Sequence, residues 1–338
     1  MAKITEFLEI MLEEKDLTFS QAKLLLDTIF EGDVPEHQIA AFLTAMRIKS
    51  PSPAELAGLA TSLRNHAVRV NTGLDNLVDT CGTGGAKIKT FNISTAAAIV
   101  AAGAGAYIAK HGNRGITSKC GSADVLAELG VKIDAAPQVI AESIRQAHIG
   151  FMFAPAFHPA MKYVQPIRKA LDFGTVFNIL GPLANPAGAT AQVIGVFNEN
   201  LMQKIAETLR LLGTKKAFVV HSEGLDEISS IAITKILELK DGNITPGTID
   251  PKDFDIAPAD FDSLKGTDAA QNAKIVSDII NDKDKGPGRD IVLLNAAAAI
   301  IVANLVDDFE SAIKIAEKSI NEGKASQCLE KLIIISNS

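Results

Sequence analysis

The chain has 338 residues, of which 47% are hydrophobic, so it can bury a large core in one or two domains. Its 33 basic and 40 acidic residues give a formal net charge of −7. This balance argues against a general nucleic-acid-binding protein, which would present a basic face, but it is compatible with a local basic pocket for a phosphorylated small molecule.

Neither export nor membrane insertion is indicated. The three cysteines have no CxxC spacing, which argues against a disulfide framework or a zinc site. The amino terminus is acidic and amphipathic, unlike a signal peptide. The longest apolar run, 291–306, contains two asparagines and is short for a membrane span. We therefore expect a soluble cytoplasmic protein with neither nucleic-acid nor membrane partners.

The first seventy residues have a helical pattern without strands. Thr18 to Gln21 and Ser52 to Glu55 both have capping-box spacing, and Pro53 occupies the favoured first helical position. Between them, Pro35 precedes another amphipathic segment that ends near Ile48. These signals predict three or four short helices that form a small unit.

Strands and helices then alternate. The pattern predicts strands at 76–80, 106–110, 131–134, 150–155, 191–197 and 216–222, and helices at 94–102, 122–129, 137–148 and 200–212. The stretch IAITKILELKDGNITPG, which ends at Gly247, predicts a hairpin with Asp241-Gly242-Asn243 at its turn. The remainder is mostly helical, with a surface loop at 283–290.

This order predicts an α/β protein. A small N-terminal helical domain (1–72) precedes a large α/β domain (73–338), whose mainly parallel central sheet is covered by helices. The segment 158–188 breaks the alternation because it is rich in Pro and Gly. We expect it to cross back to the helical unit and to form one wall of a cleft between the domains.

Two glycine-rich loops follow successive predicted strands, where ligands of α/β sheets bind. In the first, CGTGG (81–85) is followed by short polar side chains at a helix start: Asn92, Ser94 and Thr95. The second, KHGNRGITS (110–118), adds the charges of Lys110 and Arg114, with Ser118 and Ser122 near a further helix start. Each loop alone could be a simple turn, but two together suit a ligand with phosphate at both ends.

An acidic pair follows another predicted strand. Asp226 and Glu227 lie in the glycine-containing loop HSEGLDEIS (221–229). Such a pair is most often solvated surface, yet Mg²⁺ is commonly bound by a few carboxylates together with substrate phosphates. Beside two phosphate loops, a metal site is the better interpretation.

The remaining candidates are weaker. His111 lies within the second loop and is a candidate ligand contact, whereas His158 and His221 are equally compatible with a structural role. Arg168 falls on the expected cleft wall, where a guanidinium would suit a carboxylate or an aromatic ring. No Ser–His–Asp or Cys–His grouping is evident, which disfavours covalent catalysis.

Four stretches carry a family resemblance: DTCGTGGAKIKTFNIST (79–95), KHGNRGITSKCGSAD (110–124), NILGPLANP (178–186) and GLDEIS (224–229). Together they resemble the anthranilate phosphoribosyltransferases of tryptophan biosynthesis, in register over nearly the whole chain. The resemblance implies 5-phosphoribosyl 1-diphosphate (PRPP) and anthranilate as substrates, and Mg²⁺ as cofactor, with two ions per subunit. It also implies a homodimer formed through the helical domain, which helices from about 160–185 complete.

The resemblance also implies roles for individual residues. Those expected to line the PRPP site are Gly82, Gly85, Thr90, Asn92, Ser94, Thr95, Lys110, Ser118 and Ser122, and we include Ala86, Asn113 and Arg114 from the same loops. Those expected to contact anthranilate are Gly82, Asn113 and Arg168, with His111 added from its position in the second loop. Those expected to hold magnesium are Ser94, Asp226 and Glu227.

Three alternatives are weighed against this interpretation. A pyrimidine nucleoside phosphorylase would share the fold, but it typically carries a KHSTGG-like loop, which is missing here. A related phosphoribosyltransferase with another aromatic acceptor is harder to distinguish. A non-catalytic, nucleic-acid-binding relative should have a basic surface, contrary to the net charge.

Ala86 departs from the family pattern, which usually reads GTGGD. Because loss of a carboxylate removes both a metal or ribose contact and a repulsion from diphosphate, we expect Ala86→Asp to change the Mg²⁺ dependence or the PRPP affinity without abolishing activity. Steady-state kinetics of both proteins over a Mg²⁺ titration measure this. Superimposable curves would make the position irrelevant.

Overall fold

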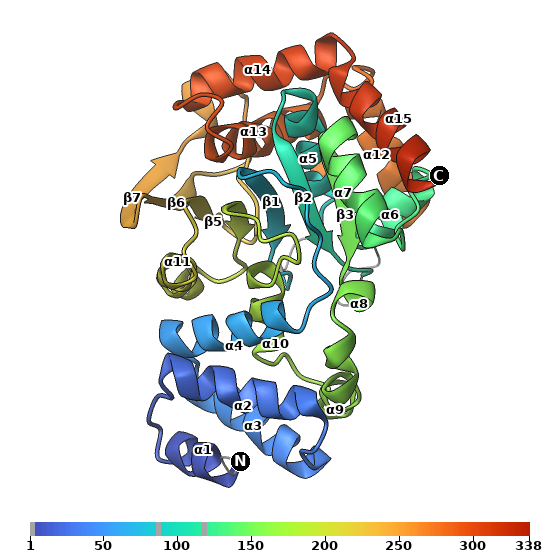
Figure 1. The fold of residues 1–338 in the computed structure, drawn as a ribbon. Coiled ribbons are helices and arrows are strands. Elements are labelled where there is room, and N and C mark those ends of the chain that lie inside the picture. Colours follow the sequence, from blue (N-terminus) through green and yellow to red (C-terminus); the bar gives the residue numbers. More distant parts are fainter. Residues whose placement is uncertain (1–3, 86–88, 116–119) are drawn as a thin grey trace.

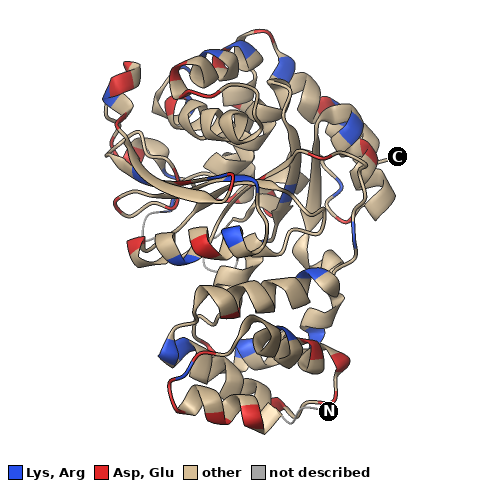
Figure 2. Cartoon of the chain, turned by 60° about the vertical axis from the view of Figure 1, so that its left-hand side comes forward, with Lys and Arg blue, Asp and Glu red and all other residues tan. Residues whose placement is uncertain are grey.

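The computed structural model describes residues 4–85, 89–115 and 120–338 (Figure 1). Two predicted site residues, Ala86 and Ser118, lie outside these ranges. The described chain forms a small helical unit beside a larger unit built on one sheet, as the sequence predicted (Figure 1). Acidic and basic residues are interspersed along both units (Figure 2).

The central sheet has seven strands in the order β3-β2-β1-β4-β5-β6-β7. They are β1 (Leu77–Gly82), β2 (Tyr107–Gly112), β3 (Ile149–Phe153), β4 (Ala191–Gly195), β5 (Lys216–His221), β6 (Thr234–Lys240) and β7 (Asn243–Ile249). β1 to β5 are parallel, and the β6–β7 hairpin adds two antiparallel strands at one edge. The predicted hairpin is confirmed, with Asp241 and Gly242 both at positive φ, as a type I′ turn requires.

Helices cover both faces of the sheet. One face packs against α5 (Ile93–Gly103) and α13 (Pro287–Val302), around which lie α6 (Ser122–Glu128), α12 (Ala269–Ile280), α14 (Phe309–Asn321) and α15 (Lys324–Ser336). The other face packs against α7 (Pro137–Ala147) and α11 (Met202–Leu211). Both layers bury aliphatic side chains of the strands, which accounts for the continuous apolar runs of a parallel sheet.

The prediction of a strand at 131–134 is wrong. These residues form the connection between α6 and α7. Val131 and Ile133 are buried in the main core, which explains the strand-like pattern. However, the amide of Val131 donates to the carbonyl of Leu126 in α6 (2.9 Å), and the amide of Lys132 donates to Ser336 Oγ (3.2 Å). The backbone therefore bonds to helices instead of to a neighbouring strand.

The helical unit consists of α1 (Ile4–Leu12), α2 (Phe19–Glu31), α3 (Glu36–Lys49) and α4 (Pro53–Asn65). Both predicted capping boxes are present, at the starts of α2 and α4. Part of the segment that follows β3 packs into the same hydrophobic cluster through side chains of α9 (Gln165–Leu171) and α10 (Phe177–Leu180). The remaining short helices there are α8 (Ala154–Phe157), η1 (Pro159–Tyr163) and η2 (Gly181–Leu183). The boundary at 72 stays a prediction.

Three further short helices, η3 (Glu199–Leu201), η4 (Pro251–Phe254) and η5 (Asp262–Leu264), lie in connections of the larger unit. In the part of the chain that the structure describes, no helix combines the length and the apolarity needed to cross a bilayer.

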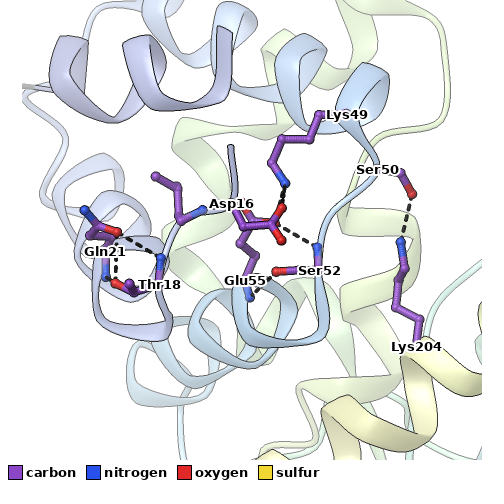
Figure 3. Close-up of polar contacts among 9 residues, drawn as sticks. Asp16, Thr18, Gln21, Lys49, Ser50, Ser52, Glu55 and Lys204 are labelled. Carbon is purple, nitrogen blue, oxygen red and sulfur yellow. Dashed lines mark hydrogen bonds and ion pairs between the residues drawn. The ribbon is translucent and has the colours of Figure 1, made fainter. Parts of the chain in front are cut away.

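A buried carboxylate ties the helical unit together (Figure 3). Glu55, fully buried on α4, accepts hydrogen bonds from the amides of Leu17 (2.9 Å) and Ser52 (2.8 Å) and pairs with Lys49 Nζ (2.7 Å). Lys49 also contacts Asp16. One side chain thus joins the α1–α2 connection, the end of α3 and the start of α4.

We expect Glu55→Ala to lower the free energy of unfolding by about 3 kcal/mol or more, because it leaves the buried Lys49 ammonium without its buried partner. The exposed capping residue Gln21 provides the control, since Gln21→Ala should cost about 1 kcal/mol or less. Urea unfolding of the three proteins measures both. Equal costs would contradict the special role of the buried pair.

Candidate functional site

The site forms where the strand order reverses. From β1 the chain proceeds to β2 and β3 on one side, and then returns to β4 on the other. Divergence of the connections at such a point leaves a crevice outside the carboxyl ends of the strands. Gly82 and Gly195 face each other there, as the last paired residues of β1 and β4.

Because the paired glycines have no side chains, the loop that carries Asp226 can approach the ends of β1 and β4. A Cβ atom on Gly195 would lie 1.6 Å from the carbonyl oxygen of Asp226, and one on Gly82 would lie 2.4 Å from its carboxylate. The Gly84 amide also donates to Asp226 Oδ2 (3.1 Å). Any larger side chain at Gly195 would therefore displace the Asp226 backbone from the ends of the strands.

Burial and mutual repulsion dominate the electrostatics of the acidic pair. Burial raises the pKa of Asp226. The pKa of Glu227 is raised to about 8, first by burial and then by the charge of Asp226, while Lys110 and a hydrogen bond from the Ser94 backbone oppose the shift. Two partly buried carboxylates with so little compensation fit a cation. Their oxygens, with the hydroxyl of Ser94 nearby, are the hard ligands that Mg²⁺ prefers.

The first predicted loop runs from β1 to α5. Gly84 and Gly85 have positive φ values of 67° and 84°, which turn the backbone sharply after the strand. At the start of α5, Asn92 Oδ1 accepts from Asn272 Nδ2 of α12 (2.9 Å). Thr95 Oγ1 is buried and, among the described atoms, has no hydrogen-bond partner. Thr90 pairs with Lys265 in an isolated antiparallel bridge.

Lys110 reaches beneath this loop from β2. Its side chain is buried, and Nζ donates to the carbonyl of Thr80 on β1 (2.6 Å). Burial lowers the pKa of Lys110, and the charges of Asp79 and Glu227 oppose that shift. The ammonium thus lies within electrostatic reach of the acidic pair but is bonded to the sheet.

A carboxylate that the sequence analysis did not single out positions the second loop. Asp79 is fully buried; it accepts from the amide of His111 (3.1 Å) and from Asn185 Nδ2 (2.7 Å). Burial raises the pKa of Asp79 to about 6, against these hydrogen bonds and the charge of Lys110. Asn185 also donates to Ala109 (2.8 Å). In the sequence, Asn185 could have been found from its place near the end of the motif NILGPLANP.

The second loop closes on the start of α6. Asn113 Oδ1 accepts from the amide of Arg114 (2.8 Å), and Asn113 O accepts from Ser122 Oγ (3.5 Å). Arg114 pairs with Asp124 of α6 (2.8 Å), and its guanidinium lies over Phe153 at 5.8 Å. The predicted charge of Arg114 is therefore partly engaged by Asp124 within the protein.

A cavity of about 640 Å³ opens above these loops, within the usual range for small-molecule sites. Its walls include Gly82 and Gly85 of the first loop, His111, Asn113 and Arg114 of the second, and Arg168 from the segment near the helical unit. Ser94 and Glu227 instead line a separate cavity of about 10 Å³. The structure thus places some predicted residues on an open chamber and two on a small pocket beside the sheet. The described predicted residues that line neither are Thr90, Asn92, Thr95, Lys110, Ser122 and Asp226.

The far side of the chamber combines neutral histidines with one arginine. The rings of His111 and His158 lie 5.1 Å apart, and burial lowers their pKa values to about 3 and about 4. Arg168 makes long hydrogen bonds, at 3.4 Å, to Gln165 and Asn178, and its guanidinium lies 5.3 Å from the Phe177 ring centroid. Its planar guanidinium faces the chamber and is suited to a carboxylate.

Comparison with known proteins agrees with this geometry. Residues 74–326 match the model of a glycosyl transferase family a/b domain, and residues 5–67 match the helical bundle domain of a glycosyl transferase family. An anthranilate phosphoribosyltransferase of Methanocorpusculum labreanum is 48% identical over 334 residues, which cover 98% of each chain.

Two solved structures are also similar over nearly their full length. Anthranilate phosphoribosyltransferase from Thermus thermophilus has a TM-score of 0.93 at 34% identity, covering 98% of this chain and 99% of the other. The enzyme from Saccharomyces cerevisiae in complex with PRPP and Mg has a TM-score of 0.89 at 27% identity, covering 99% and 98%.

The helical bundle and the a/b domain together define the class, a glycosyl transferase. Within this class, the chain belongs to the anthranilate phosphoribosyltransferase family, because the resemblance extends over 98% of its length at 48% identity.

Glu227 should make the metal-free protein less stable as the pH rises. Its pKa is about 8 in the folded protein, above the ordinary 4.5, so between these values the folded state binds more protons than the unfolded chain. The free energy of unfolding therefore falls as the pH rises. Asp79, whose pKa is about 6, contributes to this fall at lower pH and adds little above about pH 7. We expect Glu227→Gln to flatten the dependence between about pH 6 and pH 8.

Urea unfolding in chelator measures this slope. Glu223→Gln is the matched control, because Glu223 is an exposed acid of the same loop. A slope that is equally steep in Glu227→Gln and in the native protein would contradict the assignment.

Proposed function

We propose that this protein transfers the 5-phosphoribosyl group from PRPP to the amine of anthranilate, giving N-(5-phosphoribosyl)anthranilate and diphosphate, the second step of tryptophan biosynthesis from chorismate. The observation that carries the proposal is the meeting of two glycine-rich loops and a partly buried acidic pair at the point where the strand order reverses. Family membership favours this reaction over a different aromatic acceptor or a nucleoside phosphorylase.

We propose that PRPP lies along the first loop and the start of α5. Backbone amides after Gly82 and at Gly85, with the side chains of Asn92, Ser94 and Thr95, would bind the diphosphate at the helix N-terminus. Thr95 supports this role because its buried hydroxyl has no partner among the described atoms. Thr90, Lys110, Asn113, Arg114 and Ser122 belong to the same proposed site, as do Ala86 and Ser118 outside the described ranges.

Ser94, Asp226 and Glu227 are the proposed magnesium ligands, for two ions per subunit. The raised pKa values of the two acids support the proposal, since a cation would relieve the repulsion between them. A related enzyme crystallised with PRPP and Mg adds support. When bound, the metal would neutralise charge on the departing diphosphate.

Anthranilate would occupy the open chamber. We propose that Arg168 binds its carboxylate and that Gly82, Asn113 and His111 contact the ring and amine. The neutral imidazoles of His111 and His158 add no charge beside an aromatic ligand.

The chemistry requires no strong base before attack. Loss of diphosphate from the anomeric carbon gives a cation-like sugar, so the loops serve to stabilise the leaving group and to hold the amine in line. An aryl amine is already neutral near neutral pH, and its proton can leave after the new C–N bond forms. This agrees with a chamber in which burial keeps His111 and His158 neutral.

We further propose a cytoplasmic homodimer that associates through the helical unit. The proposal is supported by Leu12 and Ile48, on α1 and α3, which at 71% and 76% are the two most exposed large hydrophobic side chains of the described residues.

The reaction is tested by the loss of anthranilate fluorescence with and without PRPP. We expect Asp226→Ala/Glu227→Ala to reduce turnover by about 100-fold and to raise the Mg²⁺ requirement, because the variant lacks both carboxylates. Glu223→Ala, from the same loop, serves as control. A fluorescence loss that is independent of PRPP would refute the reaction, and an unchanged Mg²⁺ titration would refute the metal role.

A further inference from the structure

Asn295 is a buried amide in the middle of an apolar helix. It is 3% exposed on α13, where its neighbours from Ile291 to Val302 are aliphatic or alanine and equally buried. Burying an amide is costly unless each donor and acceptor finds a partner. The partners of Asn295 therefore indicate why a polar residue occupies this position.

The acidic loop supplies those partners. Asn295 Oδ1 accepts from the amide of Ile228 (2.9 Å), and Nδ2 donates to the carbonyl of Ile228 (2.8 Å). Nδ2 also donates to the carbonyl of Ile291 within α13 (2.8 Å). One side chain thus pairs both backbone groups of Ile228, much as a neighbouring strand would, and fixes the loop against the helix.

Ile228 immediately follows the acidic pair. On the other side of the pair, the Asp226 backbone lies against Gly195 and its carboxylate accepts from the Gly84 amide. The two acids are therefore held between anchors at the ends of the strands and at α13. Because like charges repel, a loop with only one anchor would let the carboxylates move apart.

We infer that Asn295 is a positioning residue, which holds Asp226 and Glu227 in the arrangement that binds the divalent cation. The inference rests on the proposed metal role of these two acids. Asn295 lines the small cavity together with Ser94 and Glu227, and its side chain is bonded to the backbone of Ile228. We therefore expect it to act on the cation by holding the loop.

Asn295→Leu is the most informative variant, because leucine is of similar size but leaves both backbone groups of Ile228 unpaired. Ser319→Ala is the matched control. Ser319 is 1% exposed in the same core, and its hydroxyl donates to the carbonyl of Val100 on α5 (2.8 Å), away from the acidic loop. If Asn295→Leu does not fold, Asn295→Ser, whose shorter side chain cannot make the same bonds, takes its place.

Two measurements without substrates test the role. Hydrogen exchange of the metal-free protein should be faster at residues 225–230 in Asn295→Leu and unchanged in Ser319→Ala. Mn²⁺ binding, followed by water proton relaxation, should weaken about 10-fold in Asn295→Leu, as for other residues that orient metal ligands. In Ser319→Ala it should match the native protein.

Faster exchange with native Mn²⁺ affinity would overturn the inference, because Asn295 would then serve stability alone. Absence of Mn²⁺ binding to the native protein would overturn it as well. A native protein that fails to consume anthranilate, but whose Mn²⁺ affinity still depends on Asn295, would refute the proposed reaction and leave the positioning role intact.

Discussion

The close approach of the Asp226 backbone to the ends of β1 and β4 is the constraint on which the site depends. It is possible only because Gly82 and Gly195 are paired in register and lack side chains. Contact at this point brings the acidic loop beside the first glycine loop, where the Gly84 amide binds the Asp226 carboxylate. A parallel sheet places all these loops at one edge, so residues more than a hundred positions apart meet there.

The charges around this contact are incompletely balanced. Burial raises the pKa values of Asp79 and Glu227 and lowers that of Lys110. The charge of Lys110 lowers the pKa of Glu227, but burial and the charge of Asp226 outweigh it. A cation beside the acids would lower this unfavourable electrostatic energy, because it would stabilise the charged form of each carboxylate.

The segment after β3 gives the chamber its second wall. It packs into the hydrophobic cluster of the helical unit and carries Arg168 and His158 to the cavity. The stability of the helical unit, which rests in part on the buried Glu55–Lys49 pair, is therefore linked to the shape of the chamber. Burial also explains why two histidines in a polar loop region remain neutral.

Local signals were sufficient for most of the fold. Capping boxes at Thr18 and Ser52 and the Asp241-Gly242 turn were predictable because each depends on a few adjacent residues. The strand predicted at 131–134 was wrong because Val131 and Ile133 are buried for a tertiary reason, their contact with helices of the main core.

By itself, the sequence determined the fold class, the two glycine loops and the acidic pair. The polar and glycine residues of each loop are adjacent in the chain, so they can be identified without the tertiary structure. Only the tertiary structure decided how these parts meet. It paired Gly82 with Gly195, joined Asp79 to Asn185 and attached Ile228 to Asn295, a residue whose sequence context suggested only an interrupted apolar run. Hydrogen bonds and close packing between residues far apart in the chain leave no local pattern, and they are what orients the site.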